Sequence, residues 1–268
     1  MHLSTQMETL WDANAAAYSR FCAGHSLYRE SSRLLVESAE LRPGMVVVDL
    51  GCGTGATTAV IVEKLENKGA ILAVDISLNM LAFAKSQIQS PCVRFIRAPA
   101  EDLDRHIARP VDRVLSNFAF FQFGDKERVL AALGRVLKPG GLFVFNSAAG
   151  GFASLDGAES DFVLDVILSE KEAAGLGSAA NMEAAVERKE LYLDNYGLRL
   201  LDLVTRDLMI SVREVLAFYR IPCVGAFLLG LPEGELERLL SVVEGRLKGR
   251  ENESILCRHA VAVIERSA

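Results

Sequence analysis

A glycine-rich segment near residue 50 has the residue types and the spacing of a site for a nucleotide-like ligand. Val46 to Leu50 is a short apolar run with β-branched residues, which is typical of a buried strand. Gly51, Gly53 and Gly55 follow, and glycine lets the backbone approach a ligand closely because it has no Cβ atom. Ala56 to Glu66 then carries apolar residues at helical spacing. A strand, a glycine turn and a helix in this order form nucleotide sites in open α/β sheets.

An acidic residue at the end of this strand separates two classes of ligand. Gly51, Gly53 and Ala56 also fit the dinucleotide fingerprint of dehydrogenases. Asp49, however, lies two positions before the first glycine. Its carboxylate would repel a pyrophosphate, whereas it suits a ligand with cationic groups. A cationic ligand is therefore favoured, and a nicotinamide cofactor is the weaker alternative.

The composition excludes several classes of protein. Half of the 268 residues are apolar, which is ample for one α/β domain with insertions. The net charge of −6 without a basic block argues against a nucleic-acid partner, and no apolar run is long enough to span a bilayer. The five scattered cysteines indicate neither a disulfide framework nor a metal site, and no signal peptide is evident. We expect a cytoplasmic protein, monomeric or homodimeric.

The rest of the chain alternates strands with helices. Beyond the first strand, the apolar runs predict strands at 70–74, 93–97, 111–117, 142–146, 198–206 and 255–264. Helices are expected within 5–40, at 78–87 with Ser77 as N-cap, and at 125–137, where Lys138-Pro139-Gly140-Gly141 ends the helix. This order predicts an α/β fold with a seven-stranded, mainly parallel sheet and helices on both faces.

Three segments depart from this alternation within a single domain of residues 1–268. They are an N-terminal helical cap (1–40) and insertions at 147–195 and 211–248, the first of which includes an expected helix from Met182 to Asn195. Ligands of open α/β sheets lie beyond the carboxyl ends of the strands. We therefore expect these helices to form a lid over that end, although helices that only enlarge the core would look the same in sequence.

The string Asp49-Leu50-Gly51-Cys52-Gly53-Thr54-Gly55 resembles the first motif of class I S-adenosylmethionine (SAM) methyltransferases, and Ile71 to Ser77 resembles the second. The resemblance implies a Rossmann-like fold, SAM as cofactor and a small-molecule substrate. In the second motif, Asp75 would accept hydrogen bonds from the ribose hydroxyls. Ile76 would pack on the adenine and Met80 would flank it.

Two further segments resemble the same family, and each differs from it at one position. Ala98 to Leu103 has Pro99 where the family has an aspartate that binds the adenine amino group, so adenine recognition would rest on the Ala100 N–H and on Glu101. Glu101 could equally be a solvated acid in a first helical turn. Val111 to Ala119 resembles the fourth strand of methyltransferases acting on malonyl carrier protein and quinone precursors, but the polar residue that often follows there is displaced, so no base is evident.

The resemblance gives a full set of cofactor residues. Trp11, Asp12 and Tyr18 match a family pattern in which Tyr18 would reach the SAM carboxylate, although a core tyrosine is nearly as good an interpretation. The expected cofactor residues are Tyr18, Asp49, Gly51, Cys52, Gly53, Gly55, Asp75, Ile76, Met80, Ala100, Glu101, Asn117 and Phe118.

Methyl transfer from SAM requires mainly that the protein align the acceptor with the methyl group. The methyl group of SAM is already a good electrophile, so the site has to orient the acceptor and exclude water, and it needs a base only for an acceptor that holds its proton. His25 is the candidate base, although a structural histidine is the stronger interpretation. Apolar candidates for the substrate wall indicate a hydrophobic or aromatic small molecule, although core packing would give the same composition: Phe152, Phe162, Phe218, Ile221 and Phe227. The main alternative function is SAM binding without methyl transfer.

Overall fold

The computed structural model describes residues 3–148, 162–177 and 192–268 of the chain. A seven-stranded sheet in the order β3-β2-β1-β4-β5-β7-β6 forms its centre. The strands are β1 (Val46–Leu50), β2 (Ala70–Asp75), β3 (Val93–Arg97), β4 (Val111–Asn117), β5 (Leu137–Ala148), β6 (Leu198–Ser211) and β7 (Ser254–Arg266). Strands β1 to β5 pair in parallel, and β7 runs antiparallel between β5 and β6. The mainly parallel α/β sheet predicted from the sequence is confirmed.

Helices cover both faces of this sheet. On one face lie α2 (Leu27–Ser38), α3 (Ala56–Lys64) and α4 (Leu78–Gln87), and their apolar residues pack on those of the strands, as Leu35 and Ile61 do with Val47 and Val144. On the other face, α5 (Leu103–His106) and α6 (Lys126–Val136) enclose a second core that contains Phe143. Residues 47–50 of β1 are buried from both sides, which is why this strand is largely apolar.

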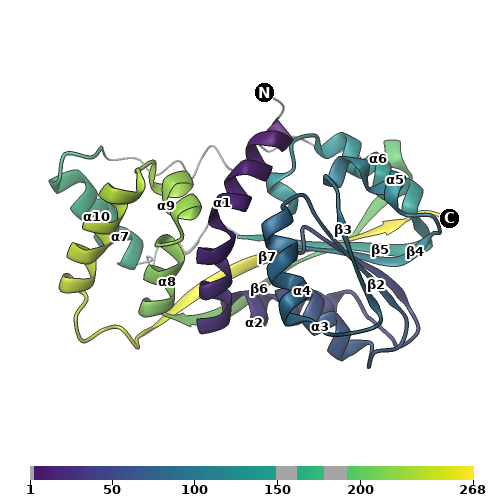
Figure 1. Ribbon diagram of the computed structural model, residues 1–268, viewed down its shortest axis with the longest axis horizontal. Coiled ribbons are helices and arrows are strands. Elements are labelled where there is room, and N and C mark those ends of the chain that lie inside the picture. Colours follow the sequence, from purple (N-terminus) through teal and green to yellow (C-terminus); the bar gives the residue numbers. More distant parts are fainter. Residues whose placement is uncertain (1–2, 149–161, 178–191) are drawn as a thin grey trace.

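A group of helices lies beside the sheet rather than on it. Helices α7 (Phe162–Ala173), α8 (Val212–Tyr219), α9 (Pro222–Leu229) and α10 (Glu233–Arg246) gather at one end of the molecule, and α1 (Leu3–Gly24) stands between them and α4 (Figure 1). Their apolar residues form one cluster that also includes residues of α1, α2, β6 and β7, and Tyr219 is fully buried in it. The long strands β6 and β7 reach from the sheet toward this group (Figure 1).

Short 3-10 turns complete the fold: η1 (Ala100–Asp102), η2 (Phe120–Gln122) and η4 (Leu193–Tyr196).

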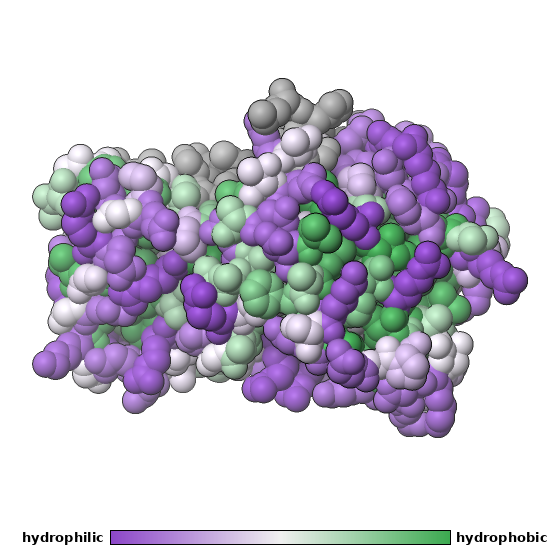
Figure 2. Space-filling model, in the orientation of Figure 1, coloured by the Kyte–Doolittle hydropathy of each residue, from purple (hydrophilic) through white to green (hydrophobic). Residues whose placement is uncertain are grey.

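The space-filling view shows hydrophilic residues around much of the surface and apolar residues gathered near β3 (Figure 2). None of the described helices is long and apolar enough to cross a membrane.

The structure corrects three element boundaries. Leu137 already pairs with Val111, so α6 ends one residue earlier and 138–141 form an irregularity inside β5 rather than a turn before it. Gly140, with φ of 72°, permits this irregularity. Strand β6 continues to Ser211 because it pairs with β7 along its whole length. Most of the helix expected from Met182 to Asn195 lies outside the described residues, and its last residues belong to η4.

Candidate functional site

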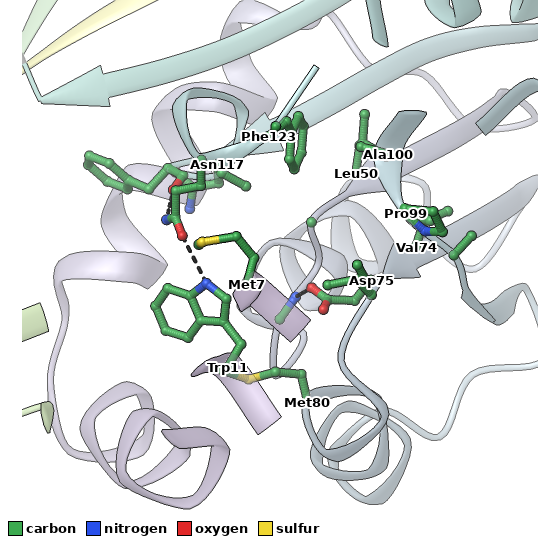
Figure 3. Close-up of a pocket in the computed structure, with 18 of the residues that line it drawn as sticks. Met7, Trp11, Leu50, Val74, Asp75, Met80, Pro99, Ala100, Asn117 and Phe123 are labelled. Carbon is green, nitrogen blue, oxygen red and sulfur yellow. Dashed lines mark hydrogen bonds between the residues drawn. The ribbon is translucent and has the colours of Figure 1, made fainter. Parts of the chain in front are cut away.

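A pocket opens at the carboxyl ends of β1, β2 and β4, and α1 forms its opposite wall (Figure 3). This is the edge at which ligands of open α/β sheets bind. Ten of the thirteen expected cofactor residues line it: Tyr18, Gly51, Gly53, Asp75, Ile76, Met80, Ala100, Glu101, Asn117 and Phe118. The other three do not line the pocket: Asp49 belongs to β1, and Cys52 and Gly55 belong to the glycine loop that follows it. Further residues that the sequence argument did not assign to the cofactor also line the pocket, among them Met7, Trp11, Tyr28, Gln122 and Phe123.

The glycine loop takes a backbone path that other residues would not follow. Gly51, Gly53 and Gly55 have φ values of 77°, 52° and 94°, in the left-handed region. A Cβ atom on Gly51 would lie 2.5 Å from the Cβ of Ala119, so a side chain there would displace the wall of the pocket. The N–H groups of Gly51 and Cys52 donate to the carbonyl of Val74, which ties the loop to β2.

The carboxylate of Asp75 faces the pocket from the end of β2 and is fixed by two backbone groups. Its Oδ2 accepts a hydrogen bond from the Gly53 N–H at 2.8 Å (Figure 3). Its Oδ1 accepts one from the Ser77 N–H at 2.9 Å. Burial raises the pKa of Asp75, and these backbone donors act in the opposite direction. Each oxygen keeps a second lone pair, so the group can still accept a hydrogen bond from a ligand.

Asp49 is a fully buried carboxylate at the end of β1 with only one of its oxygens engaged. Its Oδ2 accepts the hydroxyl of Thr58 at 2.5 Å, and its Oδ1 has no hydrogen-bond partner among the described residues. Burial raises the pKa of Asp49 to about 7, although the Thr58 bond lowers it, and the nearby negative charge of Asp75 raises it further. A buried, half-satisfied carboxylate of this kind favours a positive charge in its vicinity.

Glu101 holds the far wall of the pocket. Its Oε1 accepts the backbone N–H groups of Gly124 and Asp125, at 3.0 and 3.2 Å, so it anchors the segment that follows η2. Its side chain is buried rather than solvated. Pro99 and Ala100 lie beside it on the same wall (Figure 3).

The residue after β4 has an unusual backbone that an asparagine stabilises. Phe118 has φ of 52°, which is uncommon for a residue with a bulky side chain. Its N–H donates to Oδ1 of the buried Asn146 at 2.8 Å, and Nδ2 of Asn146 donates to Oδ1 of Asn117. The ring of Phe118 meets that of Tyr28 edge to face, with centroids 5.9 Å apart. Strain that is held in place by such contacts is typical of binding sites.

Helix α1 supplies an aromatic wall. The indole N–H of Trp11 donates to Oε1 of Gln122 at 2.8 Å, which joins α1 to η2 (Figure 3). Tyr18 packs against both Trp11 and Tyr28, with ring centroids 5.6 and 4.9 Å away. Burial raises the pKa of Tyr18 and Tyr28 well above that of a free tyrosine, so both hydroxyls keep their protons at neutral pH.

Much of the pocket lining belongs to a part of the chain that matches a known protein family. Residues 47–141 match the family model described as "Methyltransferase domain". These residues contain the glycine loop, Asp75, Glu101 and Phe118. Residues 47–141 therefore belong to a methyltransferase domain. The resemblance to class I SAM-dependent methyltransferases is confirmed for this part of the chain.

Curated relatives match less than half of the chain. A ubiquinone/menaquinone biosynthesis C-methyltransferase from Shewanella piezotolerans is 34% identical over 122 residues, which are 43% of this chain and 47% of the relative. Its counterpart from Shewanella sediminis is equally similar over the same share of each chain. This chain thus spans about half the length of the curated relatives it matches.

Solved structures share the fold with more of the chain. The [4+2]-cyclase SpnF superposes with a TM-score of 0.61 at 16% identity, over 99% of this chain and 97% of that one. A phosphoethanolamine N-methyltransferase from Haemonchus contortus, solved with S-adenosylhomocysteine, gives a TM-score of 0.52 at 17% identity, over 89% of this chain and 53% of that one. At these identities the likeness concerns the fold of the methyltransferase domain and of the helices around it.

Among the described residues, His25, Phe162, Phe218 and Ile221 do not line this pocket. The Nδ1 atom of His25 is 3.0 Å from the Phe21 carbonyl oxygen, and its ring stacks on that of Phe21. The side chains of Phe162, Phe218 and Ile221 belong to the apolar cluster of the helical group. Phe152 and the side chain of Phe227 lie outside the described residues. The roles expected for these residues stay predictions.

A buried histidine next to the methyltransferase domain was not singled out from the sequence. His259 lies on β7 with its ring edge to face on Phe118, at 4.8 Å between centroids, and its Nε2 lies 3.0 Å from the Cys257 sulfur. Burial lowers the pKa of His259 to about 4, so it is neutral at physiological pH. The only sequence signal was its position on the apolar face of the last strand, shared with Cys257 and Val261.

Proposed function

We propose that this protein binds SAM in the pocket and transfers its methyl group to a hydrophobic or aromatic small molecule. The observation that carries the proposal is the Asp75 carboxylate, held toward the pocket by the Gly53 and Ser77 N–H groups. A carboxylate at the end of the second strand is suited to accept hydrogen bonds from a ribose. When bound, SAM supplies an activated methyl group.

The residues around Asp75 fit the rest of such a cofactor. The free Oδ1 of Asp49 lies buried behind the glycine loop, and a carboxylate there complements a cationic group. Ile76, Met80 and Pro99 offer apolar surfaces to an adenine. The Ala100 backbone and the second oxygen of Glu101 remain the proposed partners of the adenine amino group.

The aromatic walls support an apolar acceptor. Trp11, Tyr18, Tyr28 and Phe118 lie together on one side of the pocket, and their rings contact one another. The Shewanella relatives are named as C-methyltransferases of ubiquinone and menaquinone biosynthesis, which favours an aromatic or quinone-like acceptor. Because Tyr18 and Tyr28 stay protonated, they are donors that orient an acceptor rather than bases that activate it.

The proposed cover over the pocket has α1 as its nearest part. Met7, Trp11 and Tyr18 line the pocket from this helix. The insertions at 147–195 and 211–248 are proposed to close over the acceptor when both substrates are bound. Such covers exclude water from the reaction.

A labelled-methyl assay tests the function. The protein is incubated with methyl-labelled SAM and a panel of phenols, quinols and acyl compounds, and S-adenosylhomocysteine and labelled product are measured. We expect both to form together with at least one aromatic acceptor, and the Asp75→Ala variant to form neither. Tight SAM binding without product from any acceptor would favour the alternative, a SAM-binding protein with another role. That alternative is kept because the similar fold of a [4+2]-cyclase shows that the fold does not fix the reaction.

A further inference from the structure

Strand β6 is a long edge of the sheet. The sheet ends in the order β5-β7-β6, so among the described residues β6 pairs with a strand on one side only. It spans 14 residues, whereas strands commonly have about five or six. The backbone groups on the outer side of such a strand form a template for another strand.

Strand β6 combines exposed apolar side chains with four charged ones, those of Arg199, Asp202, Arg206 and Asp207. Leu203 and Met209 are each 62% exposed, and Leu200 and Leu201 are 50% and 45% exposed. These four are among the seven most exposed large apolar residues of the described chain. Their concentration on one strand indicates that this edge is covered in solution.

Two charges on the same strand lack an ion-pair partner within the described chain. Arg199 pairs with Glu265, and Asp207 pairs with Arg258. Asp202 and Arg206 are exposed and form no ion pair with any described residue. They have opposite charges and lie symmetrically on either side of Val204.

Symmetry restricts how two copies of β6 can pair. In an antiparallel pair, facing residues point to the same side of the sheet. When the two strands are identical and related by a two-fold axis normal to the sheet, one residue therefore faces its own copy across the axis. If the axis lay at Arg206 or Asp207, that charged residue would face its own copy. If it lay at Leu203 or Thr205, Asp202 of one copy would not face Arg206 of the other. An axis at Val204 places Asp202 of each copy opposite Arg206 of the other. Opposite charges in such facing positions are favourable, and like charges are unfavourable.

We infer that two copies of this chain associate through β6, antiparallel and centred on Val204, so that the two sheets become one. In this register Asp202 of each copy faces Arg206 of the other, and Leu203 faces Thr205 on the opposite side of the joined sheet. The contact is independent of methyl transfer, because none of these residues lines the pocket.

A charge-exchange experiment tests the inference on the full chain. Mass is measured by light scattering after gel filtration, from low to high micromolar protein and at low salt. Wild type is expected to be dimeric, and Asp202→Arg and Arg206→Asp are each expected to be monomeric, because each places like charges opposite one another. The double variant restores opposite charges and is expected to restore the dimer.

Arg94→Asp on β3 is the matched control, since it makes the same charge change at an exposed position of the other sheet edge. It is expected to leave the dimer unchanged. Circular dichroism and SAM binding of every variant report whether the fold is intact. A monomeric wild type overturns the inference. Single variants that remain dimeric, or a double variant that stays monomeric while folded, overturn the proposed register.

Discussion

The indole N–H of Trp11 donates a hydrogen bond to Oε1 of Gln122, at 2.8 Å, and so joins the first helix to the segment after β4. Nε2 of Gln122 in turn donates to the carbonyl of Phe118. One glutamine therefore links the proposed cover to the residue with the strained backbone. The cover and the floor of the pocket should respond together to a ligand.

Tryptophan fluorescence should report this response, because Trp11 is the only tryptophan in the chain. We expect titration with SAM to change the emission of Trp11, which lines the pocket. Gln122→Ala removes the indole's partner, so its emission should shift to longer wavelength in the free protein as water replaces the amide. An emission spectrum that is identical with and without saturating SAM would contradict the placement of α1.

Two substitutions of Glu101 should separate its structural role from a role in ligand binding. Glu101→Ala removes the acceptor of the Gly124 and Asp125 N–H groups and should lower the free energy of unfolding by about 1–3 kcal/mol. Glu101→Gln keeps a carbonyl oxygen at this position and should retain most of the stability. If the carboxylate also binds the adenine amino group, Glu101→Gln should still weaken SAM binding. Equal SAM affinity of Glu101→Gln and wild type would limit Glu101 to anchoring the wall.

The raised pKa of Asp49 predicts a pH dependence of stability. An aspartate in the unfolded chain titrates near 3.8, whereas burial raises the pKa of Asp49 in the fold to about 7. Between these values the folded state binds the extra proton, so this group destabilises the fold progressively as pH rises, by up to about 1.4 kcal/mol per pH unit, and fully above pH 7. Asp49→Asn removes this dependence. Its stability relative to wild type, from urea unfolding, should therefore be higher at pH 8 than at pH 5, and a constant difference would refute the assignment.

The affinity for SAM should also depend on the ionisation of Asp49, but it should increase with pH, whereas the stability of the fold decreases. A cation beside Asp49 favours its ionised form, so SAM binding should release protons near pH 6 and strengthen as pH rises toward 8. Calorimetry in buffers of different ionisation enthalpy measures this release. The Asp49→Asn variant should show none of it.

The sequence predicted the sheet and most of the cofactor pocket because both depend on local signals. Apolar runs bounded by turns located β1 to β4. The spacing from the glycine loop to Asp75 indicated that the two lie together, and the Gly53 N–H does donate to Asp75. The bond between Trp11 and Gln122 could not be predicted in this way, because it joins residues 111 positions apart. The length of β6 depends likewise on its partner β7. Phe218 and Ile221 were predicted to form a substrate wall and pack in an apolar cluster; apolar composition does not distinguish a wall from a core, so their role stays a prediction.

Calorimetric titration of SAM into wild type and the Asp75→Ala variant tests the central claim most directly. Wild type is expected to bind at micromolar affinity. Asp75→Ala should bind about 2–3 kcal/mol more weakly, roughly 30- to 150-fold, because a buried carboxylate that accepts hydrogen bonds from the ligand is lost. Asp104→Ala, which removes a surface carboxylate paired with Arg135, is the control and should bind like wild type. Absence of SAM binding by wild type, or unchanged affinity in a folded Asp75→Ala variant, would contradict the account.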